Sequence, residues 1–150
     1  MKGRKKVIES IRILLCSIFL LIYTIEDVKD KKVNIYVGSI FLVLGIFISI
    51  ALKESMGKYV LAFIPGAFII FISYISKGAI GIGDGIAALV IGGLVGIENS
   101  IIIIFTGLLS SALWGGMMLM FFHRKKSDTI AFMPFLLIGN IVCVITRFFV

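Results

Sequence analysis

The chain has 150 residues, of which 60% are hydrophobic, and it carries a formal net charge of +7. Soluble domains are about 45–50% apolar even by a broader count, so this composition indicates a membrane protein and excludes an ordinary soluble enzyme. The basic residues fall in short segments between apolar stretches, where they contact lipid headgroups and set topology, so we expect no nucleic-acid partner.

Six apolar segments follow one another along the chain, each close to the roughly 20 residues that a helix needs to cross a bilayer. They span residues 7–25, 33–52, 59–76, 79–97, 101–122 and 130–150. Pro65, inside the third segment, predicts a kink. The pattern predicts an all-α, polytopic membrane protein, a bundle of about six transmembrane helices in a single integral-membrane domain over residues 1–150.

The first apolar segment ends at an acidic joint that holds Glu26, Asp27 and Asp30. The basic N-terminus before this segment has the charge of a signal peptide, but no small-residue cleavage site follows it, so we expect a retained first span. An acidic joint is most simply a solvated turn. The other interpretation is that one of its carboxylates belongs to a site at the membrane edge.

The fourth segment has one charged residue, Asp84, within a Gly-Ile-Gly-Asp-Gly stretch. An ionisable group at membrane depth costs roughly 2.5–3.5 kcal/mol and is a functional-site hypothesis by default. A helix that began only after Asp84 would be about 20 Å long, too short to cross. We therefore expect the polar joint near Lys77, with the glycine-rich stretch dipping into the bilayer. Gly81, Gly83 and Gly85 permit a loosened helix start and the close approach of another backbone.

Six spans place the joints after the first, third and fifth segments on one side of the membrane, so Asp27 and Asp84 are expected at the same face. Two carboxylates a few ångströms apart share one proton and can activate a water on a peptide carbonyl. This chemistry needs no metal and no cofactor, and we expect neither: the two cysteines form no CxxC pair, and the single histidine, His123, lies in a basic loop. The 15 Lys and Arg residues divide eight against seven between the two sides, which leaves the orientation open.

Three segments carry motifs in a recognisable order. Residues 27–34 read Asp-Val-Lys-Asp-Lys-Lys-Val-Asn, residues 77–84 read Lys-Gly-Ala-Ile-Gly-Ile-Gly-Asp, and residues 130–139 read Ile-Ala-Phe-Met-Pro-Phe-Leu-Leu-Ile-Gly. They resemble the first acidic motif, the Gly-x-Gly-Asp motif and the last span of the type IV prepilin (leader) peptidases, a family of GxGD intramembrane aspartyl proteases. A lone Gly-x-Gly-Asp has little specificity, whereas the ordered combination is considerably more specific.

The resemblance implies an intramembrane aspartyl endopeptidase, a hydrolase with Asp27 and Asp84 as the catalytic pair. Its substrates would be prepilins or pseudopilins, which lose a short basic leader just before their hydrophobic helix. Because such leaders stay in the cytoplasm, the site would face the cytoplasm from a prokaryotic plasma (inner) membrane. Size and layout look like the short peptidases of tight-adherence (Flp-type) pili, which lack the methyltransferase domain of larger relatives. The oligomeric state is not indicated.

Two positions depart from the family pattern: Asn34 stands where proline is usual, and Ile86 where a lysine is common. The proline's absence predicts a less rigid start of the second span. Glu26, Asp30 and Lys77 are the candidate contacts of the substrate's leader, although snorkelling to lipid headgroups explains Lys77 equally well.

Two other functions fit a carboxylate at membrane depth. One is a small transporter or channel subunit that binds H⁺ or a cation at Asp84. Many transporters consist of two similar halves with broken helices, and the absence of such a pair in this sequence argues against that function. The other is a different GxGD protease, of the presenilin or signal-peptide-peptidase type. Those proteases carry a Tyr-Asp partner motif, whereas Tyr23 here is four residues from Asp27.

Overall fold

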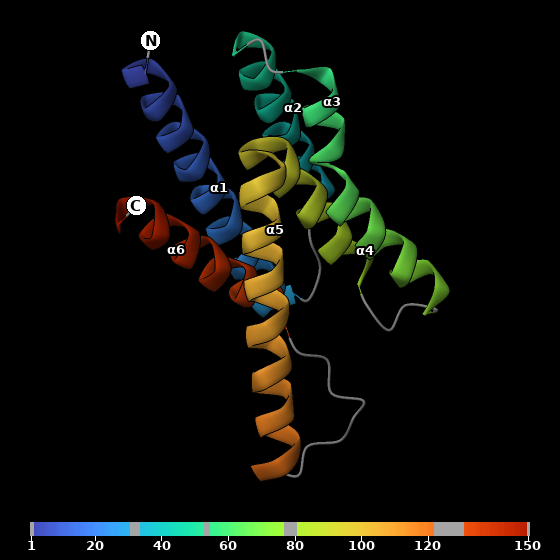
Figure 1. The fold of residues 1–150 in the computed structure, drawn as a ribbon. Coiled ribbons are helices and arrows are strands. Elements are labelled where there is room, and N and C mark those ends of the chain that lie inside the picture. Colours follow the sequence, from blue (N-terminus) through green and yellow to red (C-terminus); the bar gives the residue numbers. More distant parts are fainter. Residues whose placement is uncertain (1, 31–33, 53–54, 77–80, 122–130, 150) are drawn as a thin grey trace.

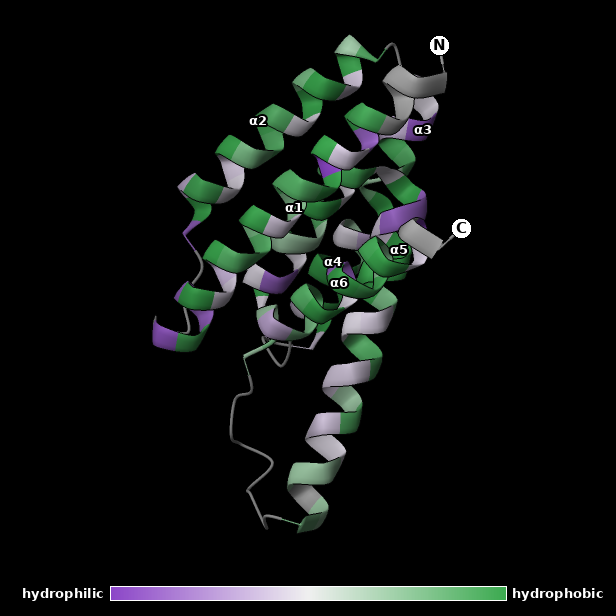
Figure 2. Ribbon diagram, turned by 90° about the vertical axis from the view of Figure 1, so that its left-hand side faces the viewer, coloured by the Kyte–Doolittle hydropathy of each residue, from purple (hydrophilic) through white to green (hydrophobic). Residues whose placement is uncertain are grey.

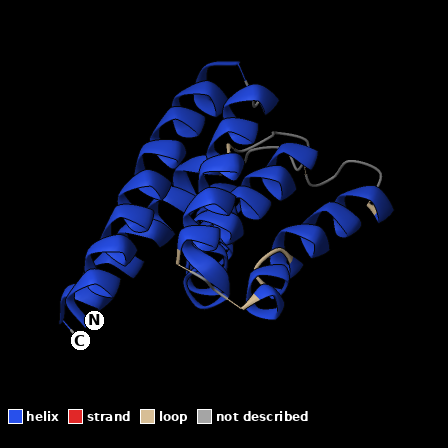
Figure 3. Ribbon diagram, turned by 90° about the horizontal axis from the view of Figure 1, so that it is seen from above, coloured by secondary structure: helices blue, strands red, loops and turns tan. Residues whose placement is uncertain are grey.

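A computed structural model describes residues 2–30, 34–52, 55–76, 81–121 and 131–149, which form helices and short connections without any strand (Figures 1 and 3). The helices are α1 (Lys2–Asp30), α2 (Ile35–Ala51), α3 (Met56–Leu61), α4 (Ile64–Ile75), α5 (Ile82–Phe121) and α6 (Met133–Phe149). Three candidate membrane spans, Val7–Lys29, Met56–Ile75 and Ile82–Met118, are accompanied by the shorter apolar helices Ile35–Ala51 and Met133–Arg147. The predicted all-α, polytopic membrane fold is confirmed.

The third apolar segment is divided into α3 and α4 by a two-residue break just before Pro65. The helix cannot continue through Pro65, because proline lacks a backbone N–H and its ring excludes the carbonyl four residues earlier, that of Leu61. Pro65 instead lies in the first turn of α4, where the missing N–H would have no partner within the helix. The predicted kink is therefore present as a two-residue break between α3 and α4.

The fourth and fifth apolar segments form two helices that meet at Gly96, where the path of the chain reverses, and both carry the label α5. Gly96 has φ 79° and ψ 175°, a conformation that is essentially restricted to glycine. Residues 98–100, which separate the fourth and fifth apolar segments in the sequence, are helical. Their side chains bond to the preceding turn: Asn99 Nδ2 donates to the Val95 carbonyl at 2.9 Å and Ser100 Oγ to the Ile97 carbonyl at 2.9 Å. The break in the helix therefore precedes the polar residues.

Contacts at glycines establish the directions of the two parts of α5. In its first part, Gly92 meets Ala62 and Gly85 meets Ile70, so residues 82–95 run antiparallel to α4. In its second part, Gly107 contacts Leu136 of α6, and Asn99 contacts Cys143 near the end of α6, so residues 97–121 run antiparallel to α6. Figure 1 shows the first part rising beside α4 and the second descending past α6 to extend beyond the other helices.

The core forms where α1, α5 and α6 meet, and α5 lies at its centre. Its fully buried members are Cys16, Phe19, Leu20 and Tyr23 of α1, Ala87, Ala88, Ile91, Leu94 and Ile103 of α5, and Met133 and Leu136 of α6. Many large apolar side chains are also exposed, as is expected of surfaces that contact lipid. Figure 2 shows that hydrophobic residues make up most of α1 and α2.

Candidate active site

Asp27 and Asp84 lie at the same end of the bundle, as the parity of the spans predicts. Asp27 is in the last turn of α1, and Asp84 is in the first turn of α5. Both residues are half-buried, and their carboxylates are close enough to interact electrostatically. The structure thus brings together two carboxylates that are more than fifty residues apart in the sequence.

The position of Asp84 is set by the start of its own helix. The Asp84 N–H donates to the Gly81 carbonyl at 3.1 Å, and the Asp84 carboxylate accepts a hydrogen bond from the Gly81 backbone. The bond from the Gly81 N–H to the Asp84 carboxylate is one half of a capping box, in which the side chain of the third helical residue reaches back to the capping residue. A negative charge in a first helical turn is also stabilised by the helix dipole. Asp84 is therefore placed by residues adjacent to it in sequence.

Gly85 brings α4 against the start of α5. A Cβ built on this buried glycine would lie 3.0 Å from the backbone nitrogen of Ile70 and would overlap the Ile70 side chain. A Cβ on Gly81 would lie 3.4 Å from Asp84 Oδ2, an ordinary contact distance, and Gly83 is half-buried. Of the three motif glycines, Gly85 has the clearest steric requirement, because another backbone passes directly beside it.

The position of Asp27 depends on α6. The backbone N–H of Met133, the first residue of α6, donates to Asp27 Oδ2 at 3.1 Å, across 106 residues of sequence. The carboxylate thus satisfies one of the N–H groups that a helix start leaves without an internal partner, and it lies at the positive end of the helix dipole. Sequence reasoning missed this contact. Pro134, at the second position of α6, was the available signal of a helix start there.

Asn34 connects the start of α2 to the end of α1 through hydrogen bonds. Its backbone N–H donates to Glu26 Oε2 at 3.0 Å, and its carbonyl accepts from the Tyr23 hydroxyl at 2.9 Å. Its side-chain oxygen caps α2 by accepting from the Tyr36 N–H at 3.0 Å. Three hydrogen bonds therefore hold the residue that stands where proline is usual, and the lower rigidity expected from the missing proline stays a prediction.

Glu26 is predicted from the sequence as a contact of the substrate's leader. In the structure its carboxylate also has a partner within the protein, the backbone N–H of Asn34. Asp30 is the last residue of α1, and nothing is described of its side chain. Lys77 and the basic loop with His123 lie outside the described residues. In the part of the chain that is described, no group of three or more His, Cys, Asp or Glu side chains could hold a metal ion.

The arrangement has the components for general acid–base hydrolysis. Two carboxylates held close together disfavour simultaneous ionisation, because each negative charge repels the other. A charged carboxylate can accept a proton from water, and a protonated one can donate a hydrogen bond to a carbonyl oxygen. The pair can therefore serve as base and acid on one substrate.

Comparison with known proteins assigns the chain to a family. No curated protein and no solved structure matches it. The family model of the type IV leader peptidase family matches residues 14–146, nearly the whole of the 150-residue chain, and that range includes both carboxylates and the start of α6. The match extends from the first membrane span to the last. The chain therefore belongs to the type IV leader peptidase family.

Proposed function

We propose that the protein is a prepilin-type leader peptidase, an aspartyl endopeptidase with Asp27 and Asp84 as its catalytic pair. The observation that carries this proposal is that carboxylates from α1 and α5 lie together at one end of the bundle, in a chain of the leader peptidase family. The whole of residues 1–150 would form one peptidase domain in a prokaryotic plasma membrane. Its active site would face the cytoplasm, where the leaders of prepilins and pseudopilins are found.

The mechanism follows from the shared proton. The charged carboxylate takes a proton from a water, whose oxygen attacks the carbonyl carbon of the scissile peptide bond. The protonated carboxylate donates its proton to the carbonyl oxygen, giving a neutral tetrahedral intermediate. The carbon–nitrogen bond then breaks as the nitrogen receives a proton from the first carboxylate and the second carboxylate takes back a proton from one hydroxyl of the intermediate, which restores the starting state of the pair. The products are a free carboxyl group on the leader and a free amine on the mature pilin.

Substrate recognition is proposed at the rim of the same end of the bundle. A basic leader is attracted by acidic residues, and Asp30 follows Asp27 by one helical turn at the end of α1. Glu26 and Lys77 are the other proposed leader contacts. Since the Glu26 carboxylate already accepts the Asn34 N–H, any contact with the leader would use its remaining acceptor capacity.

Co-expression with a candidate prepilin tests this function. The wild-type chain is expected to shorten the prepilin on a gel, and N-terminal sequencing of the product locates the cleaved bond. Asp84→Asn and Asp27→Asn are expected to leave the precursor intact, whereas Phe47→Leu, which changes an exposed apolar residue of α2, is expected to process it normally. Normal processing by either aspartate variant would refute the assignment.

A further inference from the structure

A second polar region lies at the end of the bundle opposite Asp27 and Asp84. A cavity of about 400 Å³ opens there between the beginning of α1, the beginning of α3, the reversal of α5 and the end of α6. Arg12, in its lining, is about 22 Å from Asp27 along the axis of α1, at about 1.5 Å per residue. The cavity is therefore separate from the candidate active site.

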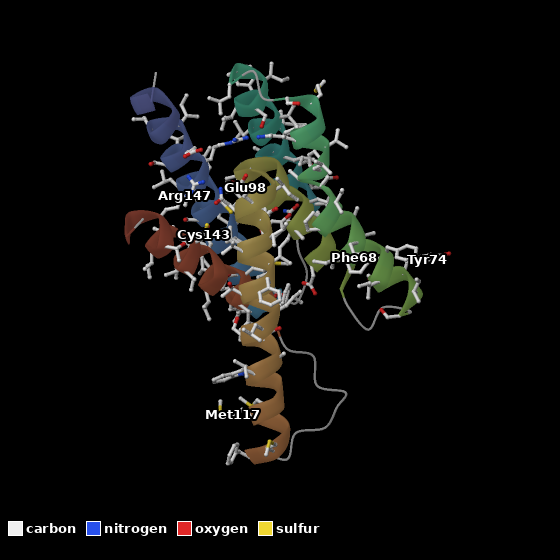
Figure 4. All side chains as sticks on the ribbon, in the orientation of Figure 1. Phe68, Tyr74, Glu98, Met117, Cys143 and Arg147 are labelled. Atoms are coloured by element: carbon white, nitrogen blue, oxygen red, sulfur yellow. The ribbon has the colours of Figure 1, made fainter. Side chains whose placement is uncertain are left out.

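The cavity is lined by charged side chains from four helices. They are Glu9, Arg12, Lys58, Glu98 and Arg147. Arg147 Nη1 and Glu9 Oε2 form an ion pair at 2.8 Å that joins α6 to α1. Figure 4 shows Glu98 and Arg147 close together on α5 and α6. With three basic and two acidic groups, the described lining has a net charge of +1.

Arg12 is the least expected member of this lining. It lies inside the apolar span Val7–Lys29, it is only 5% exposed, and its guanidinium donates a hydrogen bond to the Ser49 hydroxyl of α2. A charged side chain within a membrane span is energetically costly and faces the protein interior or a polar cavity. A guanidinium presents several N–H donors in one plane, a geometry suited to phosphate oxygens.

The rest of the lining combines the polar residues Ser55, Tyr59 and Asn99 with an apolar part. The apolar part includes Ile13, Leu52, Val95 and Ile97. The cavity lies where membrane-spanning helices end, the level at which lipid headgroups meet the hydrocarbon. A ligand suited to this position has a negatively charged group, phosphate oxygens for the basic side chains and apolar chains beside them. A phospholipid meets all three requirements.

We propose that this cavity binds the phosphodiester headgroup of a membrane phospholipid, with Arg12, Lys58 and Arg147 contacting the phosphate oxygens. Binding there joins the ends of α1, α3 and α6 around the reversal of α5. The proposal is independent of peptidase activity, because it involves neither Asp27 nor Asp84.

Native mass spectrometry of the full chain in detergent tests the proposal by titration with phosphatidylglycerol. Lys58→Gln and Arg147→Gln change exposed residues and are each expected to weaken binding about tenfold, the effect of losing one charge-assisted hydrogen bond. Lys29→Gln is the matched control: it removes one positive charge from an exposed residue at the other end of α1. Affinities that are the same in all three variants would overturn the proposal.

Three further titrations identify the ligand chemistry. Phosphatidylethanolamine, which has the same phosphodiester, is expected to bind with the same sensitivity to Lys58→Gln. Diacylglycerol, which lacks the phosphate, and inorganic phosphate, which lacks the chains, are each expected to bind at least about tenfold more weakly than phosphatidylglycerol. Equal binding of diacylglycerol would show a purely apolar groove, and equal binding of inorganic phosphate would show a site for free anions. Either result would overturn the assignment to a phospholipid.

Discussion

Asp84 and Asp27 lie at the same end of the bundle, yet Asp84 is positioned by its neighbours in sequence and Asp27 by residues far from it. Asp84 exchanges hydrogen bonds with Gly81, three residues earlier, within the first turn of α5. Asp27 accepts the N–H of Met133, 106 residues later. A motif can therefore encode one half of the pair locally, whereas the other half depends on the docking of the last helix. Substitutions at the two positions are expected to fail in different ways.

The largest effect is expected from removing either carboxylate's charge. Asp84→Asn and Asp27→Asn each eliminate general acid–base chemistry and are expected to lower the rate of leader cleavage by about 10²–10⁴-fold. Both keep an oxygen that can accept a hydrogen bond, so the chains should fold as the wild type does. The cleavage rate in proteoliposomes, measured beside the melting temperature, separates a chemical loss from a structural one. A rate within about threefold of wild type in either variant would contradict the pair.

The next effect concerns the packing beside Asp84. Gly85→Ala places a methyl group against the Ile70 backbone, and overpacking of this kind costs about 1–3 kcal/mol. The expected result is a lower melting temperature together with slower cleavage, because α4 or the start of α5 must shift. Gly116→Ala is the matched control, since a Cβ at Gly116 meets nothing within 4 Å. Equal melting temperatures in the two variants would show that α4 does not pack closely at Gly85.

A smaller effect separates the two functions of Asp27. Asp27→Ala removes the acceptor of the Met133 N–H as well as the charge, and loss of a helix-capping side chain costs about 0.5–2 kcal/mol. Asp27→Asn can keep that acceptor. We therefore expect Asp27→Ala to melt at a lower temperature than Asp27→Asn, although both are inactive. Identical melting curves would mean that α6 docks without Asp27.

The smallest effect is expected at Glu26. Glu26→Ala loses the bond from the Asn34 N–H, which is exposed to solvent, and is expected to cost about 0.5 kcal/mol. Glu26→Gln can keep the acceptor oxygen and should restore the stability. If Glu26 also attracts the basic leader, Glu26→Gln will raise KM for the prepilin while leaving kcat and the melting temperature unchanged. An unchanged KM would limit Glu26 to its structural contact with Asn34.

Much of the fold could be predicted because its signals are local. Apolar stretches long enough to span a bilayer require helices, since backbone groups in hydrocarbon must bond within their own segment. The break before Pro65 follows from the chemistry of that residue. The reversal at Gly96 was less predictable. The polar residues 98–100 indicated a joint, but their side chains bond within the turn, and the preceding glycine takes the conformation that the reversal needs.

The site could be predicted only in part, for a related reason. The count of spans was enough to place Asp27 and Asp84 at one face. Nothing near Asn34 in sequence indicated that Tyr23 and Glu26 would bond to its backbone, because those contacts require α1 and α2 to be packed already. The basic cavity at the other end likewise combines residues from four helices that show no common pattern along the chain.

The amino-acid sequence was sufficient for the membrane class, the order of the helices, the Gly-x-Gly-Asp helix start and the common face of the two carboxylates. Each of these depends on hydrophobicity, on helix length or on residues within one turn of each other. The bond from α6 to Asp27, the close packing of α4 at Gly85 and the clustering of Arg12, Lys58 and Arg147 arise only when the helices pack together. Contacts between distant segments depend on the angle and register at which helices cross, and no local pattern specifies these.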